Sequence, residues 1–122
     1  MKAISIKQPY AEWIRTGHKF IELRNWTTPY RGTLLVCSSM SADAAYKSMP
    51  LGVTVCLVDL CDVIPYHARH AILARSGAAH YKWSWILKNP VTTPHLEIRG
   101  QMKLFDPPHY IKQRLEQLHP PT

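Results

Sequence analysis

The amino-acid sequence predicts an α+β domain in which five to six short strands form a small mixed β-barrel with flanking helices. Segments that are rich in β-branched residues or that alternate in polarity recur along the 122 residues, and segments with helical spacing interrupt them. The strict strand–helix alternation of a parallel α/β fold is absent. No internal repeat and no long linker divides the chain, so we expect a single domain over residues 1–122 with its own core.

The first half of the chain predicts three strands and two helices. Lys2–Lys7 alternates around two isoleucines, which is typical of a strand. Pro9 suits the first turn of the helix that follows, because its missing N–H has no partner there, and Gly17 suits the end of that helix. The remaining elements expected in this half are a strand over Phe20–Arg24, a strand over Thr33–Ser39 and a short helix capped by Ser41.

The second half begins with the longest apolar run, Gly52–Ile64, whose β-branched residues predict a central strand. The elements expected after it are a helix over Tyr66–Ser76, a strand over Trp83–Leu87 and a strand near Glu97–Phe105. A closing helix over about residues 107–118 is predicted, with Asp106 as its cap and Pro107 at its first position. Its inward-facing residues are expected to be Tyr110, Ile111, Leu115 and Leu118.

The charge balance is basic and favours a polyanionic partner. The chain has 15 Lys and Arg against 8 Asp and Glu, which gives a formal net charge of +7. Cations that neutralise phosphates release counterions, so such an excess suits nucleic acid, although many basic proteins are merely soluble. No run approaches about 18 apolar residues, and we see no secretion signal. We therefore expect no membrane partner and a cytoplasmic location, with the nucleoid or nucleus left open.

The cysteines and histidines do not indicate a metal or disulfide site. Cys37, Cys56 and Cys61 are odd in number and lie in apolar runs without a CxxC pattern, so we expect buried, reduced thiols. His67 and His70 have helical spacing, but no third ligand is near in sequence. We expect neither a metal nor another cofactor.

Three ionisable residues, Lys19, Glu22 and Arg24, lie within six positions of each other and carry the main functional signal. Strand alternation places Glu22 and Arg24 on one face, where they would form a solvated ion pair of little energetic weight. Alternatively, Lys19 lies in the turn before the strand, and the three side chains converge with Arg31 on an anion-binding site. Asp59, inside the apolar run, is either paired structurally or part of that site.

The stretch from Ser5 to Ser39 resembles the ASCH domain, a family of the PUA-like superfamily. The pattern S-x-x-Q-P-[WY]-A, then G-x-K-x-x-E-x-R-x-W, then R-G is present in order, and later blocks such as "WSWILKNP" and "IRGQMKLF" also match. The resemblance covers about residues 3–105. The positions that carry it are Ser5, Gln8, Pro9, Tyr10, Ala11, Gly17, Lys19, Glu22, Arg24, Trp26, Arg31 and Gly32.

The resemblance implies a PUA-like β-barrel with a cleft lined by the Lys/Glu/Arg block. It also implies binding of RNA or DNA, with RNA favoured. Some bacterial members are enzymes, including an N4-acetylcytidine amidohydrolase with a K-x-x-T motif and proteins that cut RNA. This chain has Lys19 but carries Glu22 at the threonine position.

Two functional hypotheses from different classes follow. In the first, the domain binds RNA, single-stranded DNA or a modified nucleoside. Its phosphate would contact Lys19, Arg24 and Arg31, beside Gln8. Tyr10 and Trp26 either stack on a base or belong to the core. Ser5, Glu22 and Asp59 would also line the cleft. In the second, the protein is a small ribonuclease or amidohydrolase in which Lys19 and Glu22 exchange protons and Arg24 clamps the anion. A protein-interaction domain without catalysis remains a third alternative.

Overall fold

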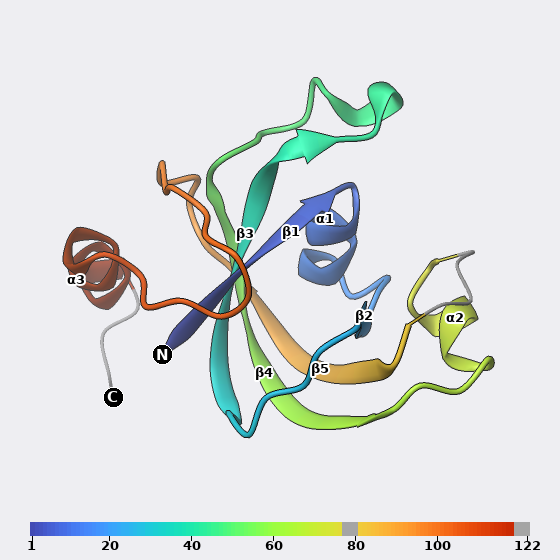
Figure 1. Cartoon of the computed structure of the whole chain (residues 1–122). Helices are drawn as coiled ribbons and strands as arrows, with labels where there is room; N and C mark the ends of the chain where they lie inside the picture. Colours follow the sequence, from blue (N-terminus) through green and yellow to red (C-terminus); the bar gives the residue numbers. More distant parts are fainter. Residues whose placement is uncertain (77–80, 119–122) are drawn as a thin grey trace.

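Five strands form one curled sheet in the order β1-β3-β4-β5-β2 (Figure 1). The structure is a computed structural model that describes residues 1–76 and 81–118. β1 and β3 pair in parallel, and the other neighbouring strands are antiparallel. The elements are β1 (Lys2–Gln8), α1 (Tyr10–Arg15), β2 (Ile21–Arg24), β3 (Gly32–Ala42), η1 (Ala44–Tyr46), β4 (Thr54–Pro65), α2 (His70–Leu73), β5 (Trp83–Thr92) and α3 (His109–Leu118).

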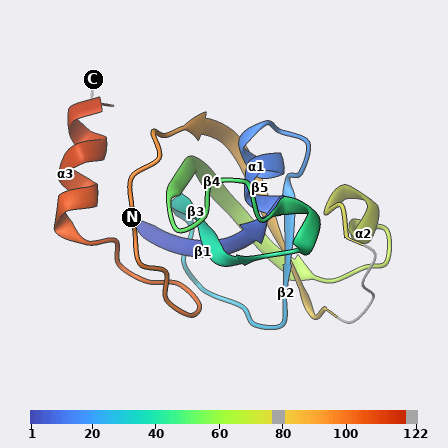
Figure 2. The same ribbon diagram turned by 90° about the horizontal axis from the view of Figure 1, so that it is seen from above.

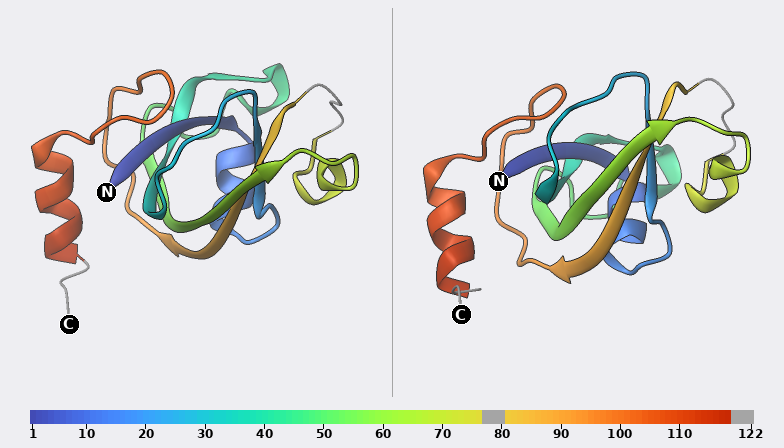
Figure 3. Two further views of the ribbon diagram at one scale, coloured as in Figure 1. Left: turned by 60° about the horizontal axis from the view of Figure 1, so that its bottom comes forward. Right: turned by 90° about the horizontal axis from the view of Figure 1, so that it is seen from below.

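The sheet curls into a half-barrel, and α1 lies at its opening (Figures 2 and 3). Irregular register within the β4–β5 pair and the β3–β4 pair supports this bending, because a bulged strand bends and twists more strongly. The curl brings the two edge strands, β1 and β2, towards each other. The Arg24 Nη2 atom of β2 donates to the Ser5 carbonyl of β1 at 3.1 Å. A side chain therefore bridges the edges that backbone pairing leaves open.

Residues of the strands pack into two large apolar layers, and a smaller third cluster joins Ile21 and Leu23 of β2 to Ala74. The inner layer joins the concave face of the sheet to α1 and contains Ile4, Ile6, Ala11, Ile14, Leu34, Val36 and Trp85, among others. The outer layer joins β1 and β3 to α3 and contains Ala3, Leu35, Cys37, Ile98, Phe105, Ile111 and Leu115. Both faces of β3 are buried over residues 34–37, and this part of the strand is accordingly a continuous apolar run, LLVC.

Most of the predicted elements are present, but two predicted helices are shorter. β3 continues through Ser41, so the prediction that Ser41 caps a helix is wrong, and only the single turn η1 follows Asp43. The helix predicted over Tyr66–Ser76 is limited to α2. His70 Nδ1 accepts a hydrogen bond from the His67 amide at 3.1 Å, which fixes an irregular turn before α2. Arg75 has a φ of 58°, which ends the helix.

The C-terminal helix begins later than predicted. The amides of Ile111 and Lys112 donate to the Pro108 carbonyl, so Pro107 is not within the helix. Asp106 does not cap it, because its carboxylate pairs with Lys2 Nζ at 3.0 Å. The packing of Ile111 and Leu115 against the sheet holds the helix in place.

Only one narrow face of α3 is buried. Ile111 and Leu115, which are four residues apart and so share a face, are 0 % and 3 % exposed. Tyr110 and Leu118 were predicted to face inward but are 56 % and 42 % exposed. Within residues 1–76 and 81–118, no second helix packs beside α3 to cover its other sides.

The predicted strand near Glu97–Phe105 is not formed. Its two ends make isolated bridges, Val53 with Glu97 and Ala3 with Phe105. Between them, residues 99–104 form a connection that we call the 99–104 loop, in which Lys103 has a φ of 57°. A positive φ interrupts the extended conformation that a strand requires. The sheet consequently has five strands within the described residues, which is at the lower end of the predicted five to six.

Cysteine burial matches the prediction at two positions of three. Cys37 and Cys56 are buried, and burial raises the pKa of each thiol to about 12. Cys61 is exposed on β4, contrary to expectation. Within residues 1–76 and 81–118, no helix has the length and apolar character needed to cross a membrane.

Candidate functional site

A pocket opens where the two edge strands of the sheet approach each other. Its volume of about 450 Å³ lies within the range of small-ligand sites. The end of β1, the start of α1, β2 with the turn before it, and the end of β3 contribute to its wall. We call it the edge pocket. The sequence-predicted site residues that line it are Ser5, Tyr10, Lys19, Glu22, Arg24 and Trp26.

Lys19 is buried at this pocket and all three of its donors are engaged. Its Nζ atom donates to the carbonyls of Ile21 at 2.8 Å and Ala74 at 2.6 Å, and lies 3.2 Å from Glu22 Oε1. A neutral amine has only two donors and a lone pair, which would face an acceptor here. The three acceptors therefore favour the ammonium form of Lys19.

Glu22 joins Lys19 to Arg24 through its two carboxylate oxygens. Oε2 accepts from Arg24 Nη2 at 2.8 Å and from Arg24 Nε at 3.1 Å, while Oε1 faces Lys19. Glu22 is 8 % exposed, so the carboxylate is shielded from water. An isolated buried carboxylate would be costly, and two cations compensate here.

Burial and charge oppose each other in this pair. Burial lowers the pKa of Lys19, and the facing Glu22 carboxylate opposes that shift. Burial alone would raise the pKa of Glu22, but Arg24 and Lys19 together hold this pKa below its ordinary value of 4.5. The arrangement is thus a buried anion held between two cations.

Arg24 is the member of this chain of charges that can still bind a ligand. Its Nε and Nη2 groups are occupied by Glu22 and by the Ser5 carbonyl. Its Nη1 group has no hydrogen-bond partner within residues 1–76 and 81–118, and the side chain is 26 % exposed. A guanidinium with one edge fixed and another edge open is suited to an anion or a carbonyl oxygen.

Three aromatic side chains line the edge pocket, and two of them, Tyr10 and Trp26, were predicted site residues, whereas Tyr81 was not. Tyr10 lies at the start of α1, and its ring centroid is 5.3 Å from Lys19 Nζ. Trp26 follows β2 and packs edge-on against Trp85, with 4.7 Å between ring centroids. Tyr10 and Trp26 are both half-buried. Each ring therefore contributes to packing and also borders the pocket.

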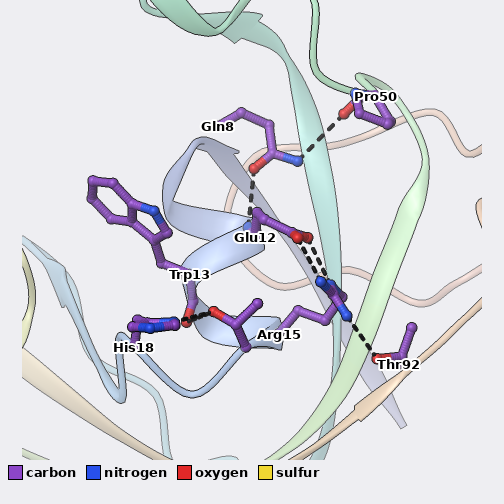
Figure 4. Close-up of polar contacts among 8 residues, drawn as sticks. Gln8, Glu12, Trp13, Arg15, His18, Pro50 and Thr92 are labelled. Carbon is purple, nitrogen blue, oxygen red and sulfur yellow. Dashed lines mark hydrogen bonds and ion pairs between the residues drawn. The ribbon is translucent and has the colours of Figure 1, made fainter.

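Gln8 is close to the edge pocket but does not line it. Its Oε1 atom accepts from the Glu12 amide at 3.0 Å, and its Nε2 donates to the Pro50 carbonyl at 3.4 Å (Figure 4). Glu12 in turn pairs with Arg15 at 2.6 Å. Gln8 is 2 % exposed, so it holds the first turn of α1, which carries Tyr10.

Arg31 and Asp59 lie outside the edge pocket. Arg31 precedes β3, and its Nη1 donates to the carbonyls of Thr28 and Tyr30. Asp59 on β4 lies opposite Thr33, near the start of β3. Its carboxylate accepts a hydrogen bond from the Asn89 side chain at 2.9 Å. The pocket is at the other end of β3, and a strand extends by about 3.3 Å per residue. The expectation that these two residues line the cleft is therefore not met.

Several lining residues were missed by sequence reasoning. They are Ile6, Lys7, Leu23, Asn25, Ser39, Ser41, Ser76 and Tyr81. Ser39 and Ser41 could have been found only from the parallel pairing of β1 with β3, which sets their ends side by side. In the described part of the chain, no group of three or more His, Cys, Asp or Glu side chains could hold a metal ion.

The fold is similar to that of an ASCH protein from Zymomonas mobilis. Its crystal structure matches with a TM-score of 0.73 and 12 % identity, over 96 % of this chain and 94 % of that chain. A tyrosine-to-phenylalanine mutant of that protein matches with a TM-score of 0.70 and 11 % identity, over 96 % of both chains. A serine-to-alanine mutant of the same protein matches with a TM-score of 0.71 and 12 % identity, over 96 % of this chain and 94 % of that chain.

The sequence comparisons give the family. No curated protein sequence matches the chain significantly. The profile of the ASCH domain matches residues 4–96, which includes β1 to β5 and the edge pocket's charged residues. The chain belongs to the ASCH domain family.

Proposed function

We propose that the edge pocket binds one nucleotide unit of RNA or single-stranded DNA, with Arg24 as its main polar contact. ASCH domains generally bind RNA. The observation that carries the proposal is the open Nη1 group of Arg24 in a pocket of about 450 Å³. Tyr10 and Trp26 offer ring surface to a base, and base–aromatic stacking tolerates every base.

The charge of the chain supports a phosphate-containing ligand. The net charge of +7 attracts polyanions over a distance of about a Debye length, before any specific contact forms. The fixed edge of Arg24 is held by Glu22, so little side-chain entropy is lost when a ligand oxygen binds the open edge. RNA is the preferred partner, and a free nucleoside is the smaller alternative ligand.

The position of Lys19 favours binding over hydrolysis. A general base or nucleophile must be within reach of the reacting atom in a state that can exchange a proton. Lys19 Nζ already satisfies three acceptors, so it would have to abandon one of them to act on a substrate. We assign Lys19 and Glu22 as positioning residues that orient Arg24.

The test is a calorimetric titration with nucleosides, nucleoside 5′-monophosphates and short single-stranded RNA and DNA of one sequence. Arg24→Ala should lower nucleotide affinity at least about tenfold, since a hydrogen bond to a charged group contributes about 1.5–3 kcal/mol. Arg15→Ala is the matched control, because Arg15 also pairs with a glutamate but does not line the pocket (Figure 4). The proposal fails if wild type binds none of these ligands at low salt, or if both variants behave alike.

An activity assay addresses the hydrolase alternative. Wild type, Lys19→Ala and Lys19→Arg are incubated with RNA and with N4-acetylcytidine. We expect no turnover by any of them. Turnover by wild type that both variants lose, while circular dichroism shows both of them folded, would assign proton transfer to Lys19 and overturn its positioning role. We also propose a cytoplasmic location, or the nucleoid or nucleus, where a nucleic-acid partner is present; detection of a labelled protein outside the cell would contradict it.

A further inference from the structure

We propose that a second subsite beside the edge pocket holds the adjoining nucleotide of the same strand. The ligand would then be a single-stranded oligonucleotide of at least two linked nucleotides rather than a free nucleoside. This inference rests on the proposed function of the edge pocket and adds a new set of contacts, made by the 99–104 loop, which the predicted site did not include.

A second cavity adjoins the edge pocket. Its volume is about 880 Å³, and it shares Ser5 and Ser39 with the edge pocket. These two residues lie on the paired strands β1 and β3, so the boundary between the cavities runs across these two strands. A ligand that extends from one cavity into the other passes over Ser5.

The 99–104 loop covers this boundary. Its flanks are fixed by backbone hydrogen bonds: the Ile98 amide donates to the Gly52 carbonyl and the Phe105 amide to the Ala3 carbonyl, each at 3.0 Å. Within the loop, Gly100 lies so close to Ser5 that an added Cβ would overlap the Ser5 hydroxyl. The loop therefore touches β1 at the residue that the two cavities share.

The loop carries two cations, one towards each cavity. Arg99 lines the second cavity. Lys103 Nζ lies 6.0 Å from the ring centroid of Trp26, which lines the edge pocket. Both residues are exposed, and neither pairs with a carboxylate within residues 1–76 and 81–118. Exposed cations without a carboxylate partner on either side of one contact point suit a phosphate that links two nucleotides.

The residues that line the second cavity indicate where the phosphate and where the base of the adjoining nucleotide would bind. Glu97 is the acidic residue of this lining, and it would repel a phosphate from its own side. Leu51, Ile98 and Tyr110 offer apolar surface that suits a base. The linking phosphate is therefore expected at the loop side, near Ser5, and the base deeper in the cavity.

Ser5 supplies an independent observation at the same point. Its Oγ atom is buried and has no hydrogen-bond partner in the described part of the chain. Buried hydroxyls usually have a partner, so this one is an unsatisfied group. A phosphate or ribose oxygen at the boundary would satisfy it after a small displacement of the loop at Gly100.

The experiment compares a nucleoside monophosphate with RNA and DNA tetranucleotides on three proteins. They are wild type, the double variant Arg99→Ala with Lys103→Ala, and the control Lys88→Ala with Lys112→Ala, which also removes two charges but lines neither cavity. We expect the tetranucleotides to bind wild type more tightly than the monophosphate. The loop double variant should lower tetranucleotide affinity about tenfold and monophosphate affinity by a clearly smaller factor, because Arg99 does not line the edge pocket and only Lys103 lies near it.

Salt dependence gives a second readout. The log–log slope for the tetranucleotide should flatten by about 0.7 for each lost phosphate contact in the loop double variant, and more than in the control. If wild type binds tetranucleotide and monophosphate with equal affinity, and the two double variants have the same tetranucleotide affinity, the proposal of a second subsite is overturned. The proposed function of the edge pocket then still stands. If wild type binds neither ligand, the proposed function itself fails. Comparison of the RNA and DNA arms identifies which sugar the subsite accepts.

Discussion

Lys19 Nζ lies 3.2 Å from Glu22 Oε1, and both side chains are buried. This ion pair is the centre of a chain of contacts that runs from the Ala74 carbonyl after α2, through Lys19, Glu22 and Arg24, to the Ser5 carbonyl on β1. The chain of contacts spans the gap between the two edges of the sheet. At one end of this chain of contacts Lys19 is fully bonded within the protein and has a structural role. At the other end Arg24 remains open to a ligand.

Replacement of Lys19 should destabilise the fold strongly. Lys19→Met removes the cation, so Glu22 Oε1 and the carbonyls of Ile21 and Ala74 lose the lysine donor, while Glu22 Oε2 keeps its bonds from Arg24. Removal of one partner from a buried ion pair costs about 3–5 kcal/mol. Urea denaturation of both proteins measures the difference in the free energy of unfolding.

The matched control for Lys19 is an exposed lysine with an ion pair. Lys2→Met breaks a 3.0 Å contact to Asp106 but should leave stability nearly unchanged, because both side chains are solvated. Equal effects of the two variants would contradict a structural role of Lys19.

The stabilisation by Glu22 should depend on pH in acid. Its pKa is held below 4.5 in the folded state by Arg24 and Lys19 against the effect of burial. A depressed carboxyl pKa adds stability that is complete above the unfolded value and is lost as the pH falls through the folded value. The excess unfolding free energy of wild type over Glu22→Gln should therefore be constant above pH 4.5 and should decrease as the pH falls below that value.

Chemical denaturation at a series of pH values checks this expectation. Glu12→Gln is the control: Arg15 lowers the pKa of Glu12 too, but that pair is more exposed and should show a smaller change. A Glu22→Gln difference that does not vary in acid would show that the carboxylate is not held charged by its neighbours.

The salt dependence of RNA binding should separate Arg24 from Arg31. Arg24→Ala should flatten the log–log slope of affinity against salt by about 0.7, since each phosphate contact on a single strand contributes about that amount. Arg31→Ala should leave the slope nearly unchanged, because Arg31 lies at the other end of β3 from the pocket. Fluorescence titration at four or more salt concentrations measures both slopes, and a larger effect of Arg31 would place the RNA elsewhere.

The contact between Gly100 and Ser5 can be tested by a double-mutant cycle. Gly100→Ala should lower the free energy of unfolding by about 1–3 kcal/mol, because the new Cβ overlaps the Ser5 hydroxyl. Ser5→Gly removes both atoms that the Cβ meets. The double variant should therefore recover most of the loss, with a coupling energy of at least about 0.5 kcal/mol. Additive effects would mean that the loop does not rest on Ser5.

The charged block of the site was predictable because its members are close in sequence. Lys19 precedes the strand and Glu22 and Arg24 share a strand face, so a helix-to-strand junction brings them together whatever the rest of the fold does. Lys19 was expected to contact the ligand, however, and its burial against Ala74 could not be foreseen. That contact joins residues 55 positions apart and depends on where α2 packs.

The positions of Arg31, Asp59 and the 99–104 loop depended on long-range geometry. Residue spacing fixes which face a strand residue occupies but not how far along a neighbouring strand it lies. The "IRGQMKLF" segment has the composition of a strand, yet the isolated bridges lie only at its flanks: Glu97, just before it, bridges to Val53, and Phe105, its last residue, bridges to Ala3. The close approach of Gly100 to Ser5 then shapes the middle of the segment into a loop.

The central claim is that Arg24, and not Lys19, meets the ligand. A crystal structure of the protein with a bound RNA tetranucleotide tests it most directly. The account predicts a phosphate or base oxygen within about 3.2 Å of Arg24 Nη1, a typical hydrogen-bond distance, with Lys19 Nζ still bound to Ile21, Ala74 and Glu22. An RNA that lies outside the edge pocket, or that contacts Lys19 Nζ in place of Glu22, would contradict it.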